Sequence, residues 1–389
     1  MHEVASSAGA DVALVHDWLN GMRGGERCLE LIADEFPAAD VYTLLYRPEA
    51  VSEKIRRHTV HASGLRRLPF FRERYRYFLP LFPAAIGRFR LGDGVKLVVS
   101  TSHCVAKGIR VPPGARHLCY CFTPMRYAWI LQDAYFGSGR SAKRWAIDQV
   151  LRRLRAWDAA ASDRVDRFVA ISRHVQERIR RFYGRESTIV YPPVDTGFFT
   201  PAGAGAGEDE WPAAMPAAAR AEGYDLVVSA LVPYKRVDLA VEAARRTGRT
   251  LVVAGAGSEE KALRAGAPSN VHFVGRPTDR AIRTLYRHCR ALLFPGEEDF
   301  GIVPLEAQAC GRPVVALGRG GALETVVDGV SGTFFAEQTA DALAEALLRA
   351  DGAAWDAAAI RAHAEAFAPA RFLDGLRREI EATRRGERL

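Results

Sequence analysis

The sequence has no apolar run long enough to span a bilayer as a helix, and its first residues lack a basic segment followed by an apolar one. Cysteine is sparse as well. The six cysteines are scattered along 389 residues, and only Cys119 and Cys121 are close, with a C-x-C spacing instead of the C-x2-C of zinc ribbons and redox sites. We therefore expect buried, reduced thiols and a cytoplasmic protein.

Several chemical signatures are also missing. The chain shows no metal-ligand cluster, no convincing Ser/His/Asp order and no carboxylate pair suited to a glycosidase. The turn at Gly24 and Gly25 lacks the G-x-G-x-x-G spacing of a dinucleotide site. No nucleic-acid motif accompanies the net charge of +8. We expect no tightly bound metal or cofactor and no nucleic-acid partner.

The positive charge is concentrated between Arg56 and Arg90, which include nine arginines and a single acid, Glu73. Aromatic residues are interleaved with them: Phe70, Phe71, Tyr75, Tyr77, Phe78, Phe82 and Phe89. Arginines bind lipid phosphates and aromatic rings favour the membrane interface, so an anionic membrane is one candidate partner. An equally good interpretation is a solvated basic face above core aromatics.

The apolar pattern predicts an α/β protein of two domains. Short β-branched runs alternate with helical stretches in 12–191, and the same rhythm restarts at 225. A chain of this length exceeds what one core usually supports. We predict an N-terminal domain over 1–199, a connection or surface excursion over 200–223 and a C-terminal domain over 224–369. A last amphipathic helix, about 370–389, is expected to pack on the first domain.

The strongest candidate site is the segment Gly296–Glu306, which lies between the predicted strands RALLF and PVVAL. Ligands of open parallel sheets bind beyond the carboxyl ends of the strands, so Glu298 is placed at the rim and Glu306 near the start of a helix. Their carboxylates could accept hydrogen bonds from sugar hydroxyls. Either glutamate alone is better explained as an exposed or helix-start acid.

The segment EEDFGIVPLEA resembles the E-x7-E motif of the family-4 retaining glycosyltransferases, and ALGRGGALETVVDG, VAISRHVQERI, YPPVD and LVPYKRVD extend the resemblance over nearly the whole chain. It implies the GT-B fold, with two Rossmann-like, doubly wound parallel-sheet domains facing a cleft. It also implies a nucleotide-diphosphate sugar as donor. The predicted donor-binding residues are Gly24, Gly25, Lys235, Arg236, Glu298, Phe300, Gly301, Ile302, Val303, Glu306, Gly320 and Gly321.

The resemblance assigns roles to some of these residues. Lys235 matches a lysine that binds the donor diphosphate, Glu298 would orient the donor sugar and Glu306 the ribose. The family usually has an arginine five residues before the lysine, where this chain has Ala230, so Arg236 or another arginine is expected to supply the second charge. The glycines at 318, 320 and 321 would let the backbone approach an anion.

Acceptor-side residues are predicted in the first half: His103, Arg126, Trp129 and Arg173, each following a predicted strand. We group His103 with Lys235 and Glu298 as the candidate catalytic residues. The family often has a histidine immediately before the Thr-Pro of YCFTPMRYAW, where this chain has Phe122, so that histidine's role does not carry over. A structural role for each acceptor-side residue remains an alternative.

The implied activity is a retaining transfer from the donor to a glycan or polyprenyl-linked acceptor. The whole pattern looks most like mannosyltransferases of O-antigen or exopolysaccharide synthesis, which suggests GDP-mannose, with a UDP-sugar as the alternative. Such an enzyme would act in the cytoplasm or on the inner face of the cell membrane. Two other hypotheses are a GT-B-like epimerase or phosphorylase and a non-catalytic basic module that binds lipid or nucleic acid.

Overall fold

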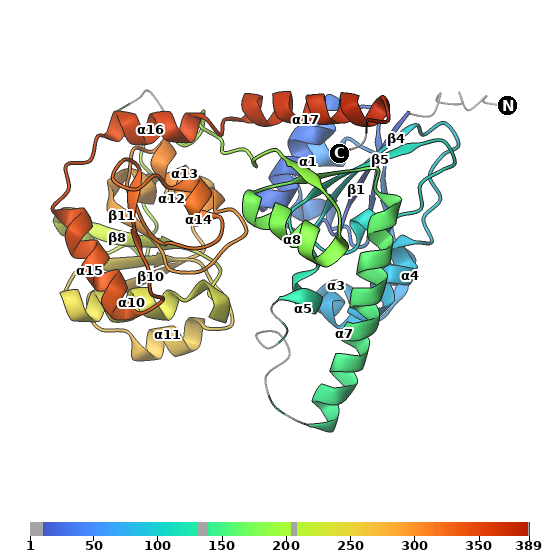
Figure 1. Ribbon diagram of the computed structural model, residues 1–389. Helices are drawn as coiled ribbons and strands as arrows, with labels where there is room; N and C mark the ends of the chain where they lie inside the picture. The colour runs from blue at the N-terminus through green and yellow to red at the C-terminus, as the bar shows by residue number, and fades with distance from the viewer. Residues whose placement is uncertain (1–10, 131, 133–138, 140, 204–207, 388) are drawn as a thin grey trace. The chain divides into compact units, whose positions relative to one another are not determined.

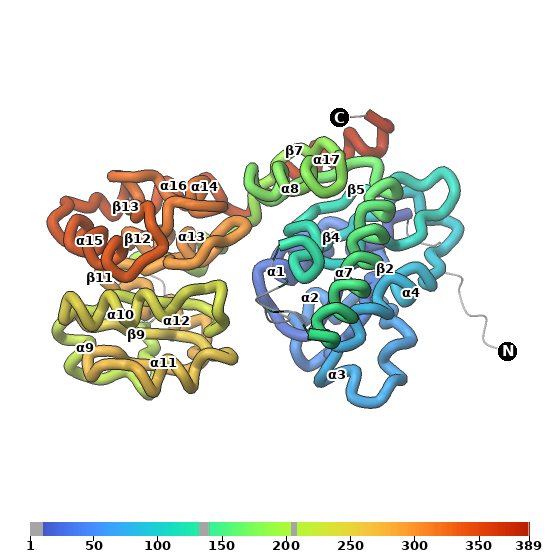
Figure 2. The backbone as a smooth tube through the Cα atoms, turned by 60° about the horizontal axis from the view of Figure 1, so that its bottom comes forward, coloured from blue at the N-terminus to red at the C-terminus, as the bar shows by residue number. Residues whose placement is uncertain are grey.

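The computed structural model describes residues 11–130, 132, 139, 141–203, 208–387 and 389. The chain divides into two compact units, one comprising Met1–Pro192 with Phe372–Leu389 and the other Pro193–Arg371. In both units helices flank a parallel sheet (Figures 1 and 2). The α/β class with two Rossmann-like units, predicted from the alternating pattern, is confirmed.

The first unit contains a seven-stranded sheet in the order β3-β2-β1-β4-β5-β6-β7. Its strands are β1 (Val12–His16), β2 (Asp40–Thr43), β3 (Val60–Ala62), β4 (Leu97–Ser102), β5 (Arg116–Cys121), β6 (Arg167–Ala170) and β7 (Ser187–Ile189). Neighbouring strands are parallel throughout. The strand order reverses between β1 and β4, so the loops that leave these two strands flank a topological switch point, where ligands of such sheets bind.

Helices on the two faces of this sheet bury different apolar stripes. Helix α1 (Gly24–Glu35) buries Leu29 and Ile32, at the helical spacing that the sequence predicts. Helix α7 (Ala142–Ala161) contributes Leu151 and Leu154 to the core on the other face, with Val15 of β1. Helix α8 (Arg173–Tyr183) starts at a serine cap and ends at a left-handed glycine.

The end of the chain packs on this first unit. Helix α17 spans Pro369–Arg384, and from Phe372 onward it belongs to the first unit. The Phe372 ring lies 5.5 Å from the ring of Tyr120 on β5. Arg167 of β6 pairs with Glu379 at 2.5 Å, both largely buried. The helix therefore covers β5 and β6 with apolar and charged contacts.

The second unit contains a six-stranded sheet in the order β10-β9-β8-β11-β12-β13, again parallel throughout. Its strands are β8 (Tyr224–Val228), β9 (Leu251–Ala254), β10 (Val271–Gly275), β11 (Cys289–Phe294), β12 (Val314–Leu317) and β13 (Gly332–Phe335). Its longer helices are α10 (Val237–Thr247), α12 (Asp279–His288), α13 (Ile302–Ala309), α15 (Ala340–Asp351) and α16 (Ala357–Glu365). Its switch point lies between β8 and β11.

The segment predicted as a connection or excursion, 200–223, lies within the second unit as far as it is described. Asp209 accepts hydrogen bonds from Arg287 and His288 at 3.1 and 2.6 Å. Helix α9 (Ala217–Glu222) follows and leads into β8. Asp209 of this Ala- and Gly-rich stretch thus contacts two side chains at the end of α12.

The basic aromatic segment separates into buried and exposed side chains. It forms η2 (Gly64–Arg67), α3 (Phe71–Arg74), η3 (Tyr75–Leu81) and α4 (Phe82–Ile86). Phe71, Tyr75 and Phe82 are core residues of the first unit, whereas Phe70 and Tyr77 are 71% and 83% exposed. The expectation of core aromatics is correct for the first group only. All six cysteines are buried and unpaired, as expected.

Candidate functional site

Three loops meet at the carboxyl edge of the second sheet because their strands, β8, β11 and β12, are neighbours. The first loop carries Lys235 at the end of η6 (Pro233–Lys235), and the second carries Glu298. The Lys235 Nζ forms an ion pair with Glu298 Oε1, and both side chains are mostly buried. Two residues predicted from separate motifs are therefore brought together across the switch point.

Glycines in these loops allow backbone to pack on backbone. A Cβ at Gly296 would lie 2.9 Å from the Cα of Lys235, and one at Gly321 would lie 2.2 Å from the Cα of Phe300. At Gly320 a Cβ would lie 2.5 Å from the carbonyl oxygen of Glu298. The structure thus gives Gly320 and Gly321 a packing reason that differs from the expected one, since the neighbouring loop fills the Cβ positions. Contact with an anion stays a prediction for these glycines.

Helix α13 presents its amino end at this edge. Gly301 precedes it with a φ of 106°, a left-handed conformation that favours glycine. The amides of Ile302 and Val303 belong to the first turn, where backbone N–H groups have no intrahelical acceptor. Such N–H groups and the helix dipole favour an anion, for example a phosphate.

Glu306 is the fifth residue of α13, near the start of the helix as the sequence predicts. Its Oε2 accepts a hydrogen bond of 2.8 Å from the hydroxyl of Tyr286, a buried residue of α12. Phe300 is buried, with its ring 5.9 Å from that of Phe367. Tyr286 was not predicted from the sequence, because α12 buries several polar residues and nothing distinguishes Tyr286 from Arg283 or Thr284.

Two positions near Lys235, Arg236 and Ala230, bear on the expected phosphate clamp. Arg236 adopts a left-handed φ of 51° as the N-cap of α10. Its guanidinium donates hydrogen bonds of 3.0 and 2.9 Å to the two carboxylate oxygens of Asp238. Ala230 is exposed on the loop after β8 and brings no charge. In this structure Arg236 is engaged by its own helix, and Lys235 is the cation held by the neighbouring loop.

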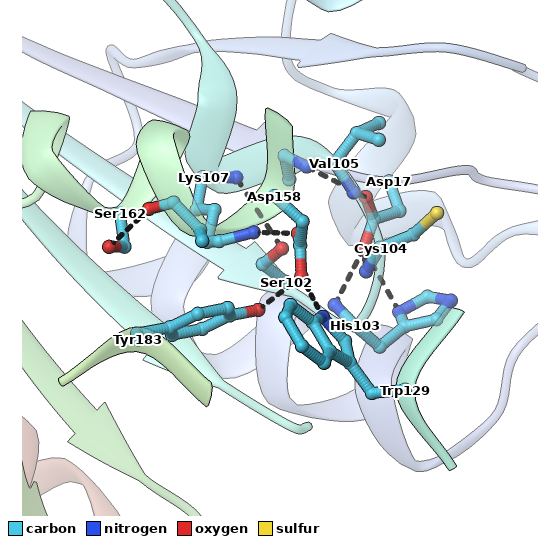
Figure 3. Close-up of polar contacts among 12 residues, drawn as sticks. Asp17, Ser102, His103, Cys104, Val105, Lys107, Trp129, Asp158, Ser162 and Tyr183 are labelled. Carbon is cyan, nitrogen blue, oxygen red and sulfur yellow. Dashed lines mark hydrogen bonds and ion pairs between the residues drawn. The ribbon is translucent and has the colours of Figure 1, made fainter. Parts of the chain in front are cut away.

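In the first unit a buried carboxylate organises the switch point. Asp17, directly after β1, accepts hydrogen bonds from four consecutive backbone N–H groups of the loop after β4, residues 103–106, at 2.6 to 2.9 Å (Figure 3). It is completely buried. The sequence analysis did not single out this acid. Its position immediately after the first strand was the one available signal.

The side chain of His103 contacts the same carboxylate, that of Asp17. Its Nδ1 lies 3.1 Å from Asp17 Oδ2, and its ring meets the edge of Trp18 at 4.4 Å between centroids. Burial lowers the pKa of His103, and Arg126, Arg23 and Arg76 lower it further, while Asp17 raises it. A neutral imidazole that donates from Nδ1 to Asp17 keeps the lone pair of Nε2 for an incoming hydroxyl. The side chain is 27% exposed.

The glycine-rich turn and Phe122 pack against each other. Gly24 and Gly25 open α1, and a Cβ at Gly25 would lie 3.3 Å from the Phe122 ring. That ring is edge-on to His16, 6.5 Å away. His16 is buried, its Nδ1 is 2.7 Å from Thr101 Oγ1, and burial lowers its pKa to about 3. Phe122 therefore packs in an aromatic cluster beside the glycine-rich turn. At the position of Phe122 the family-4 glycosyltransferases often have a histidine.

The remaining acceptor-side candidates have different surroundings. Trp129 donates from Nε1 to the buried Asp158 at 2.8 Å, and Asp158 also binds Lys107 and the hydroxyl of Tyr183 (Figure 3). This network gives Trp129 a structural role in holding α5 (Arg126–Trp129) against α7. Arg126 begins α5 and lies close enough to His103 to affect its titration. Arg173 is exposed at the start of α8, beyond β6.

Among the described residues no group of three or more histidines, cysteines and acids could hold a metal ion. The expected lack of a tightly bound metal stays a prediction. In the same part of the chain no helix combines the length and the apolar character that crossing a bilayer would require.

Each unit matches a glycosyltransferase domain model. Residues 22–198 match "Glycosyltransferase Family 4" and residues 219–350 match "Glycosyl transferases group 1". A D-inositol 3-phosphate glycosyltransferase of Mycobacteroides abscessus is 32% identical over 234 residues, 55% of this chain and 51% of that protein. The alpha-1,3/1,6-mannosyltransferase ALG2 of Dictyostelium discoideum is 40% identical over 75 residues, 19% of this chain and 18% of that protein.

A solved structure of HepE from Anabaena, in complex with UDP, aligns with a TM-score of 0.67 at 16% identity over 96% of this chain and all of that one. This likeness shows the fold, which is GT-B. The chain spans about half the length of the curated relatives it matches. The predicted resemblance is confirmed at the level of glycosyltransferase domains and of the GT-B fold.

Proposed function

We propose that this chain, whose two units are glycosyltransferase domains, moves a hexose from a nucleoside diphosphate sugar to an acceptor hydroxyl with retention of configuration. The Lys235–Glu298 ion pair at the switch point of the second sheet is the observation that carries the proposal. A cation and a carboxylate held side by side there match the two demands of such a donor, a diphosphate to neutralise and sugar hydroxyls to orient.

The second unit supplies the donor groups in this proposal. Lys235 and the first-turn amides of α13 would bind the diphosphate, and Glu298 would accept hydrogen bonds from the sugar. Glu306, oriented by Tyr286, would accept from the ribose hydroxyls. The HepE structure, which has the same fold and was solved in complex with UDP, supports a nucleotide-containing donor.

The reaction balances without a covalent enzyme intermediate. The acceptor oxygen bonds to the anomeric carbon on the face from which the phosphate leaves, as the bond between that carbon and the phosphate oxygen breaks. The hydroxyl proton passes to the departing phosphate. Negative charge grows on the diphosphate during this step, and Lys235 together with the α13 amides would stabilise it.

On the acceptor side, His103 Nε2 would accept a hydrogen bond from the attacking hydroxyl and so orient its oxygen. Asp17 fixes the tautomer that leaves this nitrogen free. Arg126 and the turn at Gly24 and Gly25 would line the same region. Arg173 remains a candidate contact at its far side.

For the substrates we propose GDP-mannose as donor, a polyprenyl-linked glycan as acceptor, and a place in O-antigen or lipopolysaccharide synthesis at the inner face of the cell membrane. The mannose assignment is supported by the likeness to ALG2. The structure of HepE with UDP supports a uridine donor instead.

A thermal-shift series with GDP-mannose, GDP, UDP-glucose, UDP and ADP-glucose tests the donor proposal, since a bound ligand raises the melting temperature by mass action. GDP-mannose should give the largest shift, and Glu306→Ala should remove it. A larger shift with UDP-glucose would overturn the mannose assignment. No shift with any sugar nucleotide, or conversion of one to an isomer without an acceptor, would overturn glycosyl transfer.

A further inference from the structure

One segment of the first unit exposes apolar side chains on a fixed base. Four large hydrophobic residues in 68–81 are well exposed, and we call them the apolar rim: Leu68 (38%), Phe70 (71%), Tyr77 (83%) and Leu81 (45%). Phe70, Tyr77 and the half-buried Phe78 line a shallow surface hollow with Pro69 and Arg74. Apolar surface gathered in this way marks an interaction site more often than scattered single residues do.

The base beneath the rim is fixed because buried residues recur every three or four positions along the same segment. Phe71, Tyr75, Leu79 and Phe82 all belong to the core of the first unit. The Phe71 ring packs edge-on against Phe82 and Phe78, at 6.4 and 5.3 Å. The packing of these buried rings therefore fixes the backbone that carries the exposed side chains of the apolar rim.

Phe70 is unusual in its backbone as well as in its exposure. Its φ is 58°, in the left-handed region that suits glycine or asparagine and strains a bulky residue. Its ring, being mostly exposed, gives little burial energy in return. A strained residue that displays an apolar ring to solvent is better explained by an interaction than by folding.

The surroundings of the rim are strongly basic. Arg66, Arg67, Arg72 and Arg74 are all exposed, and Glu73 is the one acid from Gly64 to Leu81. The Arg74 guanidinium lies 5.9 Å from the centre of the Phe70 ring. We propose that the apolar rim and these arginines dock the protein on an anionic phospholipid bilayer, with the rings in the interface and the guanidiniums on lipid phosphates.

The charge pattern favours a bilayer over other occupants. A second copy of this surface would bring like charges together, which opposes self-association. Leucine at both ends of the rim suits acyl chains and adds nothing to binding a polynucleotide, whose bases stack on aromatic rings. Each arginine near an anionic surface strengthens binding by about fivefold, so four can hold a protein without any inserted helix.

The rim also lies next to the candidate acceptor site. The ring centre of Tyr75, which is buried under the rim, lies 5.2 Å from that of Trp18, and the ring centres of Trp18 and His103 are 4.4 Å apart. Arg76 extends over Tyr75 at 5.7 Å. A lipid-linked acceptor in the same bilayer would thus arrive beside His103. This last step rests on the proposed function, whereas bilayer binding does not.

Flotation of the full chain with vesicles tests the proposal. We expect it to float with vesicles of phosphatidylglycerol and phosphatidylcholine and to stay behind with phosphatidylcholine alone. Phe70→Ser with Tyr77→Ser should weaken partitioning at least about tenfold, and Arg66→Gln with Arg67→Gln and Arg72→Gln about fivefold per arginine. Leu348→Ser, which removes a side chain that is 61% exposed on α15 of the second unit, is the matched control and should float like the parent.

Stability and donor binding separate the possible outcomes. The rim variants should keep the parent's melting temperature and its shift with sugar nucleotides, and Phe70→Gly should raise the melting temperature while it weakens flotation. Equal flotation of parent and rim variants would overturn the proposal, as would no binding to anionic vesicles. If sugar nucleotides do not raise the melting temperature of the parent protein, that result contradicts the proposed function alone and leaves the bilayer proposal standing.

Discussion

Each unit places an acid in one of the two loops that flank its switch point, and the two acids are used differently. In the first unit Asp17, in the loop after the first strand of the switch point, is fully buried and bound by four amides and a histidine. In the second unit Glu298, in the loop after the strand on the other side of the switch point, is mostly buried and paired with Lys235. The first arrangement fixes a loop and aims an imidazole, whereas the second leaves a cation and a carboxylate that a ligand can share. A switch point can thus serve as an anchor or as a binding site.

The largest expected effect separates the cations of the second unit. Lys235→Ala should lower kcat/KM by about 1000-fold, or about 4 kcal/mol of transition-state stabilisation, because it removes the charge proposed to meet the leaving diphosphate. The melting temperature should fall as well, because the mostly buried Glu298 carboxylate loses its cation, so the rates are compared on folded protein. Initial rates with a sugar nucleotide would measure this.

The matched control is Arg236→Ala, the next residue along the chain. Its guanidinium is already bound to Asp238, so we expect a loss below about tenfold. Equal losses in the two variants would mean that Arg236 leaves Asp238 to complete a phosphate clamp, and the distinction drawn between the two cations would fail.

Removing the anchor of the first unit should mainly cost stability. Asp17→Ala leaves four buried backbone N–H groups without their acceptor, and a loss of at least about 3 kcal/mol in the free energy of unfolding is expected. Glu298→Ala should cost less, about 1 to 2 kcal/mol, because it removes one acceptor and the Lys235 side chain left behind is 21% exposed to water. Urea unfolding of both variants makes the comparison; similar losses would contradict the different uses of the two acids.

Acid should weaken the first unit before the second. Burial lowers the pKa of His16 to about 3 and of His117 to about 4, so the unfolded chain binds their protons more tightly and stability falls as the pH drops below about 6.5. At pH 5 each histidine should cost about 2 kcal/mol. Glu26, whose pKa burial raises to about 6, offsets about 1 kcal/mol by gaining its proton in the folded state.

Substitution can locate this acid sensitivity. His117→Gln keeps hydrogen-bonding groups for Ser100 and the Arg164 carbonyl and should remove about two thirds of the net loss measured by thermal unfolding between pH 7 and pH 5. His363→Gln is the control in the second unit, where the imidazole is half-buried. An unchanged loss in His117→Gln would show that other groups control the acid response.

The smallest expected effect concerns how Glu306 is oriented. Tyr286→Phe removes the hydroxyl that donates to Glu306 Oε2 and keeps the buried ring. We expect sugar-nucleotide affinity to fall about threefold to tenfold, in line with one hydrogen bond of about 1 kcal/mol. Titration calorimetry would show it. An affinity unchanged within error would mean that Glu306 is positioned without Tyr286.

The donor side was predictable from sequence because parallel strands carry their loops to one edge. Lys235 and Glu298 lie in separate motifs, yet each follows a recognisable apolar strand, so their proximity follows from the topology. The anchor at Asp17 was not predictable, because its partners are backbone amides that no side chain reveals. The hydrogen bond from Trp129 to Asp158 was not predictable either, because the two residues are distant in sequence. An acceptor contact of Trp129 stays a prediction.

The basic segment shows a further limit of sequence patterns. Its aromatic residues look alike by composition, and the adjacent Phe70 and Phe71 show the difference, since one is mostly exposed and the other is in the core. The buried residues Phe71, Tyr75, Leu79 and Phe82 recur every three or four positions, although short helices of two kinds carry them. Spacing, and not aromatic content, therefore separates the buried side chains from the exposed ones.

The return of residues 372–389 to the first unit makes the second unit an insertion in the chain, entered after Pro192 and left after Arg371. Evolution or an experimenter can therefore exchange 193–371 as a single cassette, and the first unit would keep both of its chain ends. Under the proposed function, such an exchange would replace the donor-binding residues and leave those of the first unit unaltered.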